Sequence, residues 1–107
     1  MKKLFTIVAS VAIVSVLVVA CYAKDVASSG EALFKEHCAV CHPDGGNIVN
    51  PQFALHGKDL KAHSITKPSQ IVGKLRNPGP GMTKFDKKTI SDKDAMKIAQ
   101  YVLKTFK

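Results

Sequence analysis

The 107-residue chain contains no tryptophan and no segment in which apolar and polar residues alternate as a half-buried strand requires. It has no internal repeat, and beyond its apolar N-terminus it has no low-complexity segment. No nucleic-acid-binding motif accompanies its positive charge, which argues against nucleic acid as the partner. Because no strand pattern is present, the sequence predicts an all-α fold.

Acidic residues are scarce: 8 Asp and Glu stand against 16 Lys and Arg, and the formal net charge is +8. A basic surface of this kind suits acidic protein partners or an anionic membrane surface.

Cysteine is also rare, but two of the three cysteines stand in the run Cys38-Ala39-Val40-Cys41-His42. C-x-x-C-H is the motif that attaches c-type haem, with each thiol forming a thioether and the histidine binding the iron. A redox dithiol would need a βαβ pattern beside the motif, whereas we expect helix on both sides of it. A zinc site would need a second ligand pair, which the sequence lacks. We therefore predict one covalent haem c on Cys38 and Cys41, with His42 as the proximal iron ligand.

The N-terminus has the pattern of an export signal. The basic pair Lys2-Lys3 precedes the apolar run from Leu4 to Ala20, which is near the length of an uncleaved membrane anchor. The segment from Val18 to Cys21 resembles a bacterial lipobox, in which Cys21 would become the acylated first residue. Ordinary signal-peptidase cleavage after Ala23 would instead remove Cys21. Residues 1–23 are thus a signal peptide or lipoprotein leader, and we expect a periplasmic protein that is free or tethered to the inner or outer membrane.

Residues 24–107 make one small domain of 84 residues. A core of this size is marginal by itself, and a buried haem would supply the missing apolar centre. We expect a helix from Ser28 or Ser29 into the haem motif, turn formers at 43–47 and an extended loop at 47–57. A short helix should follow at 58–63, another should start at 66–68, and the Pro- and Gly-rich run 77–81 should break it. A last helix opens at Ser91, and its apolar stripe is Ala95, Ile98, Ala99, Val102, Leu103 and Phe106.

Four positions carry a resemblance to the class I cytochromes c, and more narrowly to the cytochrome c6 and c553 group. Gly30 and Phe34 precede the haem motif, and Ile98 and Tyr101 lie near the C-terminus, at the family's helix-packing positions. Segments 41–47 and 77–82 also resemble those of small exported monohaem cytochromes of metal-reducing bacteria. The resemblance implies three to five short helices around one covalent haem, with Gly30 allowing close helix approach and Phe34 and Tyr101 covering the haem edge.

The second axial ligand is predicted to be Met82, which lies 40 residues after His42 and follows Gly79-Pro80-Gly81. The other methionine of the mature part, Met96, suits packing between helices. The remaining alternatives are an open site or a histidine, namely His37, His56 or His63. Cytochromes c6 usually carry Met-Pro here, whereas this chain has Met82-Thr83, which bears on the stiffness of the loop.

Ligation by His42 and Met82 would leave the iron without a vacancy, which predicts electron transfer and not enzyme catalysis. We also expect the protein to be a monomer. The alternatives are a small haem peroxidase, a ligand-binding haem protein, or a structural or regulatory haem subunit. Lys84, Lys87 and Lys88 follow the ligand loop and form either a docking face for acidic redox partners or a merely solvated face. Lys58 and Lys61 offer a second basic site, and the hydrogen-bond partner of His42 is open between Pro51 and neighbouring carbonyls.

Overall fold

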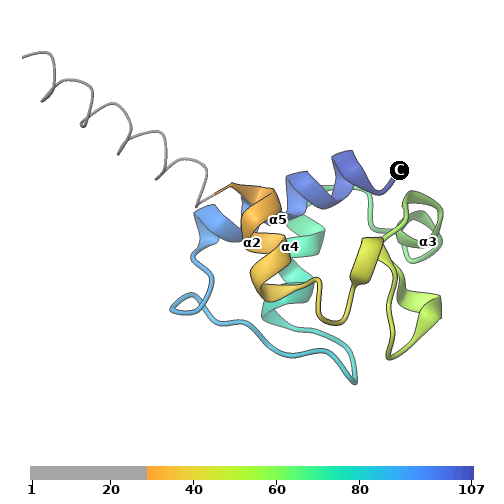
Figure 1. Cartoon of the computed structure of the whole chain (residues 1–107), viewed down its shortest axis with the longest axis horizontal. Coiled ribbons are helices and arrows are strands. Elements are labelled where there is room, and N and C mark those ends of the chain that lie inside the picture. Colours follow the sequence, from red (N-terminus) through yellow and green to blue (C-terminus); the bar gives the residue numbers. More distant parts are fainter. Residues whose placement is uncertain (1–28) are drawn as a thin grey trace, which may run out of the picture.

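The computed structural model describes residues 29–107. Over this range it contains helices and turns and no strand, which confirms the all-α prediction (Figure 1). The leader, Cys21 and the start of the predicted domain lie outside the described residues. In the described part of the chain, no helix is long and apolar enough to cross a membrane. The elements, in order, are α2 (Gly30–His37), the 3₁₀ turns η1 (Pro43–Gly45) and η2 (Pro51–Phe53), α3 (Gly57–Ala62), α4 (Pro68–Arg76) and α5 (Asp92–Thr105).

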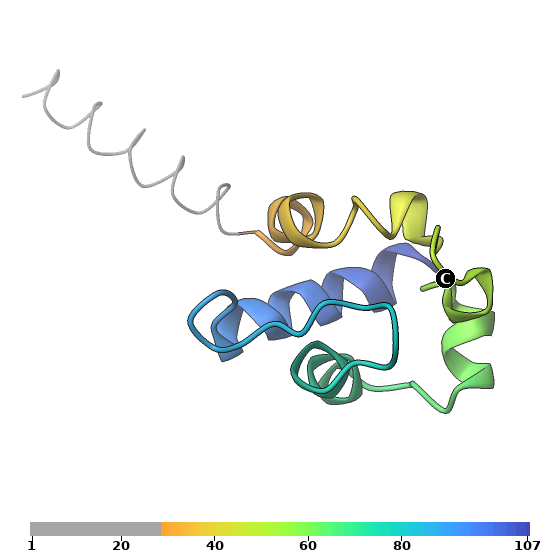
Figure 2. The ribbon, with the colours of Figure 1, turned by 90° about the horizontal axis from the view of Figure 1, so that it is seen from below.

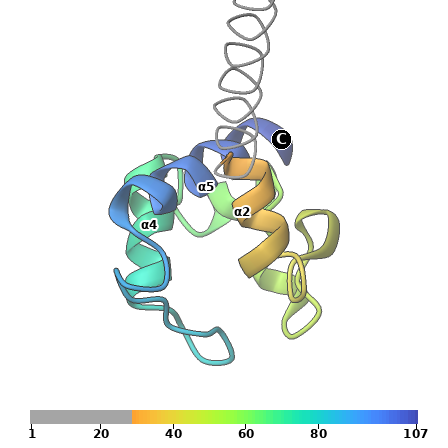
Figure 3. The same ribbon diagram turned by 60° about the vertical axis from the view of Figure 1, so that its left-hand side comes forward.

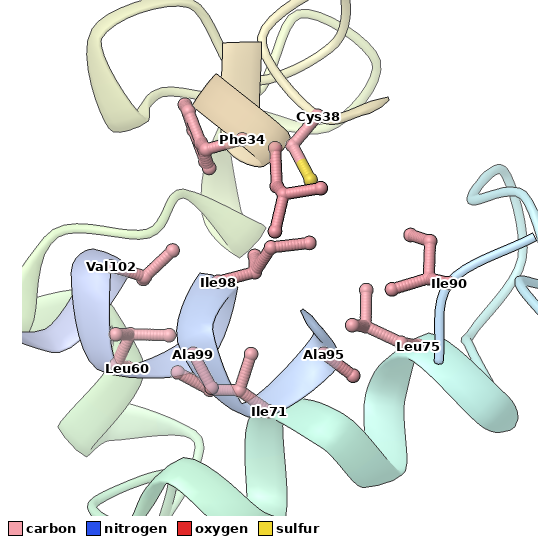
Figure 4. Packing of buried hydrophobic residues seen from close by; sticks show 11 residues of the cluster. Phe34, Cys38, Leu60, Ile71, Leu75, Ile90, Ala95, Ile98, Ala99 and Val102 are labelled. Carbon is pink, nitrogen blue, oxygen red and sulfur yellow. The ribbon is translucent and has the colours of Figure 1, made fainter. Parts of the chain in front are cut away.

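Helix α5 lies in the middle of the fold, with α2 packed on one side and α4 on the other (Figure 2). Its buried residues are Ala95, Ile98, Ala99 and Val102, four members of the predicted apolar stripe. Ile71 and Leu75 of α4 meet this stripe in the common core (Figure 4). The spacing of three and four residues places these side chains on one face of each helix, so the hydrophobic pattern predicted the packing correctly.

Side-chain caps set the starts of α2 and α5, the first and last helices that the structure describes. Ser29, one of the two predicted caps, accepts a hydrogen bond from the Ala32 N–H at 3.2 Å. Ser91 does the same for the Asp94 N–H at 3.1 Å, as predicted for the last helix. Each hydroxyl satisfies an N–H group that has no partner within its own helix.

Helix α2 precedes the haem motif as expected, but the residues after the motif form only the short 3₁₀ turn η1, so the expectation of helix on both sides is wrong for the second side. The helix ends at His37, and the next five residues form tight turns. The backbone N–H groups of Cys41 and His42 both donate to the Cys38 carbonyl, at 3.2 and 2.9 Å. The turn that follows is η1, which the run of Pro and Gly residues predicted. The stretch 47–57, expected to be extended, contains η2, whose start is capped by the Asn50 side chain.

Two loops extend from the helices to the same side of the molecule. One connects the haem motif to α3 and carries η2; the other joins α4 to α5 and carries Met82 (Figures 1 and 3). Helix α3 packs against η2, which braces the first loop.

Candidate functional site

A cavity of about 350 Å³ opens between the helices and these two loops. Cys38, Cys41, His42 and Met82 all lie on its wall, although 40 residues separate the last two. The helices contribute apolar side chains to the wall, namely Phe34, Leu60, Ile71, Leu75, Ile98 and Val102. In Figure 4 the Cys38 sulfur is directed toward Ile98 of α5. The fold therefore brings all four predicted haem residues to one apolar cavity.

His42 is buried, and a single hydrogen bond orients its ring. Its Nδ1 lies 2.7 Å from the carbonyl oxygen of Gly46. A carbonyl only accepts, so Nδ1 must carry the proton and Nε2 keeps its lone pair. That tautomer leaves Nε2 available to a metal. The partner of the histidine is thus Gly46, within the Gly-rich turn, and not Pro51.

The turn that supplies the Gly46 carbonyl is packed against the C-terminus. Gly45 has φ +78°, and a Cβ on it would meet Phe106 ring carbons at 2.5 Å. The Gly57 N–H donates to the Phe106 carbonyl at 2.7 Å. Phe106 also stacks at a tilt on Phe34, with ring centroids 5.3 Å apart. The end of the chain therefore fixes the turn that orients His42.

The two cysteines of the motif differ in exposure. Cys38 is buried, and burial raises the pKa of its thiol to about 11, while Cys41 is half-buried. A neutral thioether suits this apolar wall, whereas zinc would require thiolates. Among residues 29–107, no group of three or more His, Cys, Asp or Glu side chains could hold a metal ion. The donor set therefore fits a haem held by thioethers and does not fit zinc.

Met82 is half-buried on the cavity wall, whereas Met96 is 36% exposed on α5 and does not line the cavity. The expectation that Met96 packs between helices is wrong. It follows buried Ala95 by one residue, about 100° around the helix, and it is not part of the core cluster.

Two of the three alternative histidines also line the cavity. The ring of His63 stacks on Phe53 at 4.5 Å, and its Nε2 lies 3.0 Å from the Gln52 carbonyl, to which it must donate. His37 meets the edge of Phe85 at 6.1 Å. His56 occupies the N-cap position of α3, where its side chain makes no capping hydrogen bond, and it does not line the cavity.

Asn47 is a cavity-lining residue that the sequence analysis did not single out. Its Oδ1 accepts from the N–H groups of Val49 and Asn50, at 3.0 and 2.9 Å, and its Nδ2 donates to the Phe53 carbonyl at 3.1 Å. These bonds shape the loop that forms one wall of the cavity. An Asn directly after a Gly-Gly turn was the available signal, because its side chain readily bonds nearby backbone.

The predicted docking lysines lie outside the cavity wall. Lys84, Lys87 and Lys88 are exposed, and Lys87 pairs with Asp92 at 3.1 Å. The lysine that does line the cavity is Lys74 on α4, which the sequence analysis did not single out. Tyr101 packs on Phe34 with ring centroids 5.4 Å apart, but of the two only Phe34 reaches the cavity.

Comparison with known proteins points to the same class. A family model described as cytochrome c oxidase, cbb3-type, subunit III, matches residues 25–102. Cytochrome c6 of Cyanidium caldarium is 35% identical over 69% of the chain and 66% of its own length. Cytochrome c6 of Synechocystis is 40% identical over 69% of the chain and 61% of its own length. The chain thus spans just under two thirds of these two relatives.

Solved structures agree with these sequence matches. OmcF, outer membrane cytochrome F from Geobacter sulfurreducens, is 42% identical, with a TM-score of 0.72 over 74% of this chain and all of that one. Cytochrome c6C from Synechococcus is 27% identical, with a TM-score of 0.67 over 72% of this chain and 93% of that one.

A helical fold around an apolar cavity, with a C-x-x-C-H motif on its wall, defines a class I cytochrome c. The chain belongs to this class and, within it, to the cytochrome c6-like monohaem cytochromes, which carry one covalently bound haem c.

Proposed function

We propose that the protein is an exported one-electron carrier whose haem is attached through Cys38 and Cys41 and ligated by His42 and Met82. The observation that carries the proposal is that the two candidate ligands, far apart in sequence, line the same apolar cavity as both cysteines. When bound, the haem supplies a one-electron couple of iron.

The chain's own residues suit that role in two ways. The Gly46 carbonyl holds the His42 ring in the tautomer that leaves Nε2 free. The Met82 thioether is a soft donor and favours ferrous over ferric iron, which raises the reduction potential relative to ligation by two histidines. If His42 and Met82 both bind the iron, no site would remain for peroxide or oxygen, and the protein would work as a carrier and not as an enzyme.

The optical spectrum of the ferric protein tests the ligand assignment. Wild type should show the far-red band of an iron–methionine bond. Met82→Ala should lack this band, and its midpoint reduction potential should be lower than that of wild type. Met96→Leu is the matched control and should keep both, because Met96 lies outside the cavity wall.

A wild-type ferric protein that lacks the band and binds added azide readily would overturn the proposal. That result would favour the peroxidase or ligand-binding alternative. Loss of the band in Met96→Leu would instead reassign the ligand.

The charge and the leader support two further parts of the proposal. Without Lys2 and Lys3 of the leader, 14 Lys and Arg stand against 8 Asp and Glu, and this net charge of +6 suits acidic redox partners, which would dock near Lys84 and Lys88 beside the ligand loop. Cys21 is proposed as an acylated N-terminus that tethers the protein in the periplasm, since several acyl chains anchor stably where one does not. A mature mass that begins at Lys24 without acyl chains would show cleavage after Ala23 instead.

A further inference from the structure

We propose that Arg76 is a positioning residue that holds the Met82 loop against the end of α4. The inference rests on the proposed His42/Met82 ligation and adds to it the group that keeps the thioether in place. It follows from two hydrogen bonds at Phe85, just beyond Met82, and from a third that ties the same guanidinium to α5.

The first two bonds attach Phe85, three residues after Met82, to the last turn of α4. The Phe85 N–H donates to the Leu75 carbonyl at 2.9 Å, and Nη1 of Arg76 donates to the Phe85 carbonyl at 3.1 Å. Both backbone polar groups of Phe85 are therefore bonded to consecutive residues of α4. Phe85 also lines the cavity, so this attachment fixes a point of the cavity wall close to the methionine.

The third bond ties the same guanidinium to α5. Nη2 of Arg76 donates to Oδ1 of Asp92, the first residue of α5, at 2.8 Å. The Arg76 side chain is 21% exposed, against 62% for Asp92 and 74% for Lys87, the other cation on Asp92. A rigid planar fork with several donors can serve both partners at once, which a lysine ammonium on a flexible chain does less well.

The sequence of the loop explains why such an attachment matters. The residue after Met82 is Thr83, not a proline, so the backbone there lacks the restriction that a pyrrolidine ring imposes. On the other side of Met82, Gly81 has φ +88°, a conformation that Gly adopts without strain. The bonds to Phe85 restrict the chain immediately after this flexible stretch.

The experiment measures how readily an added ligand displaces Met82 in the ferric, haem-loaded full chain. Imidazole is the probe, and its binding is followed by loss of the far-red band while far-UV circular dichroism monitors the fold. Arg76→Met keeps the apolar stem but removes the hydrogen bonds. It should bind imidazole about tenfold more tightly than wild type, because a hydrogen bond with a charged donor is worth about that factor or more.

Two matched controls separate the attachment at Phe85 from the ion pair at Asp92. Lys87→Gln removes the other cation on Asp92, and Asp92→Asn removes the charge but leaves Nη1 of Arg76 on the Phe85 carbonyl. Both should bind imidazole within about twofold of wild type. Heating should also remove the band of Arg76→Met well below the temperature at which its helices unfold.

Wild-type imidazole affinity in Arg76→Met would overturn the proposal, as would an equal increase in Asp92→Asn. If Arg76→Met does not fold, Arg76→Lys is tested in the same assay. Its affinity for imidazole should be severalfold higher than that of wild type, and an affinity equal to that of wild type would overturn the proposal. A wild-type protein without the far-red band would contradict the ligation by Met82, which is a different failure and is visible before any variant is made.

Discussion

At Gly30 the absence of a side chain sets the distance between α2 and α5. A Cβ there would overlap the backbone carbonyl of Lys97 and lie 3.0 Å from the Cβ of Tyr101. Both neighbours belong to α5, and because the nearer one is backbone, it has little room to move aside. The sequence predicted this role correctly, because the family's packing pattern places a small residue where two helices cross.

Gly30→Ala should therefore destabilise the protein by about 1–3 kcal/mol, the usual cost of an added methyl in a packed contact. Gly73→Ala is the matched control, since a Cβ at Gly73 in α4 meets nothing within 4 Å. It should stabilise by up to about 1 kcal/mol, because alanine favours a helix interior over glycine. Denaturant unfolding of the haem-loaded proteins measures both, and an unchanged stability of Gly30→Ala would contradict the close approach.

At the scale of the elements, the segment that enters α5 is held by a side chain that the sequence did not reveal. Oδ1 of Asp86 accepts from the N–H groups of Lys88 and Thr89, at 3.0 and 2.8 Å. The turn delivers Ile90 to the core, where it is 1% exposed. The bonds from Thr89 are the main reason that the pKa of Asp86 is lowered, with Lys88 and Arg76 contributing less.

This shift makes the stability depend on pH. Because the folded-state pKa of Asp86 lies below its unfolded value of about 3.9, the carboxylate stabilises the fold fully above that pH. Its contribution is lost as the pH falls through the folded-state pKa. Asp86→Asn, which keeps an acceptor but no charge, should melt at a lower temperature than wild type at pH 7. The two melting temperatures should converge as the pH falls through the folded-state pKa of Asp86.

Asp86→Ala provides the comparison, because it lacks the acceptor at every pH. Its melting temperature should stay below that of wild type even in acid. If the difference in melting temperature between Asp86→Asn and wild type stays the same at every pH, the charge of Asp86 has no part in holding the turn.

At the scale of the whole molecule, the excess of basic residues does not surround the cavity evenly. The exposed lysines after Met82 lie beyond the cavity wall, and Asp92 offsets the charge of Lys87. Val40 and Val49, by contrast, are apolar residues of the cavity wall itself. If an acidic partner docks beside the ligand loop as proposed, the exposed lysines would guide its approach.

Neutralising Lys84, Lys87 and Lys88 together to Gln should slow reduction by an acidic partner and flatten its dependence on salt, since screening has less charge to act on. Lys87→Gln alone should give about a third of this effect, because it removes one of the three charges. Stopped-flow rates over a range of ionic strength measure both, with an unchanged optical spectrum as the check on the haem.

The control is Lys58→Gln combined with Lys61→Gln on α3. A triple variant with the salt dependence of wild type would show that the cluster is a solvated face. A flattened dependence in the α3 variant would place docking there.

The sequence by itself determined the cofactor, the helical class and the packing face of each long helix. These depend on local patterns: C-x-x-C-H has few chemical uses, and apolar residues three and four apart must share a helix face. It also singled out Met82, because a Gly-Pro-Gly bend before a thioether is a local feature.

Only the tertiary structure decided how the site is held. The Gly46 carbonyl on His42, the three bonds of Asn47 and the position of Arg76 between Phe85 and Asp92 depend on how turns and loops fold back on the helices. Met96 was expected between helices but is 36% exposed, since helical spacing does not say how far a neighbouring helix covers the edge of an apolar face. Hydrogen bonds between distant segments follow no sequence period, so they appear only when the chain is folded.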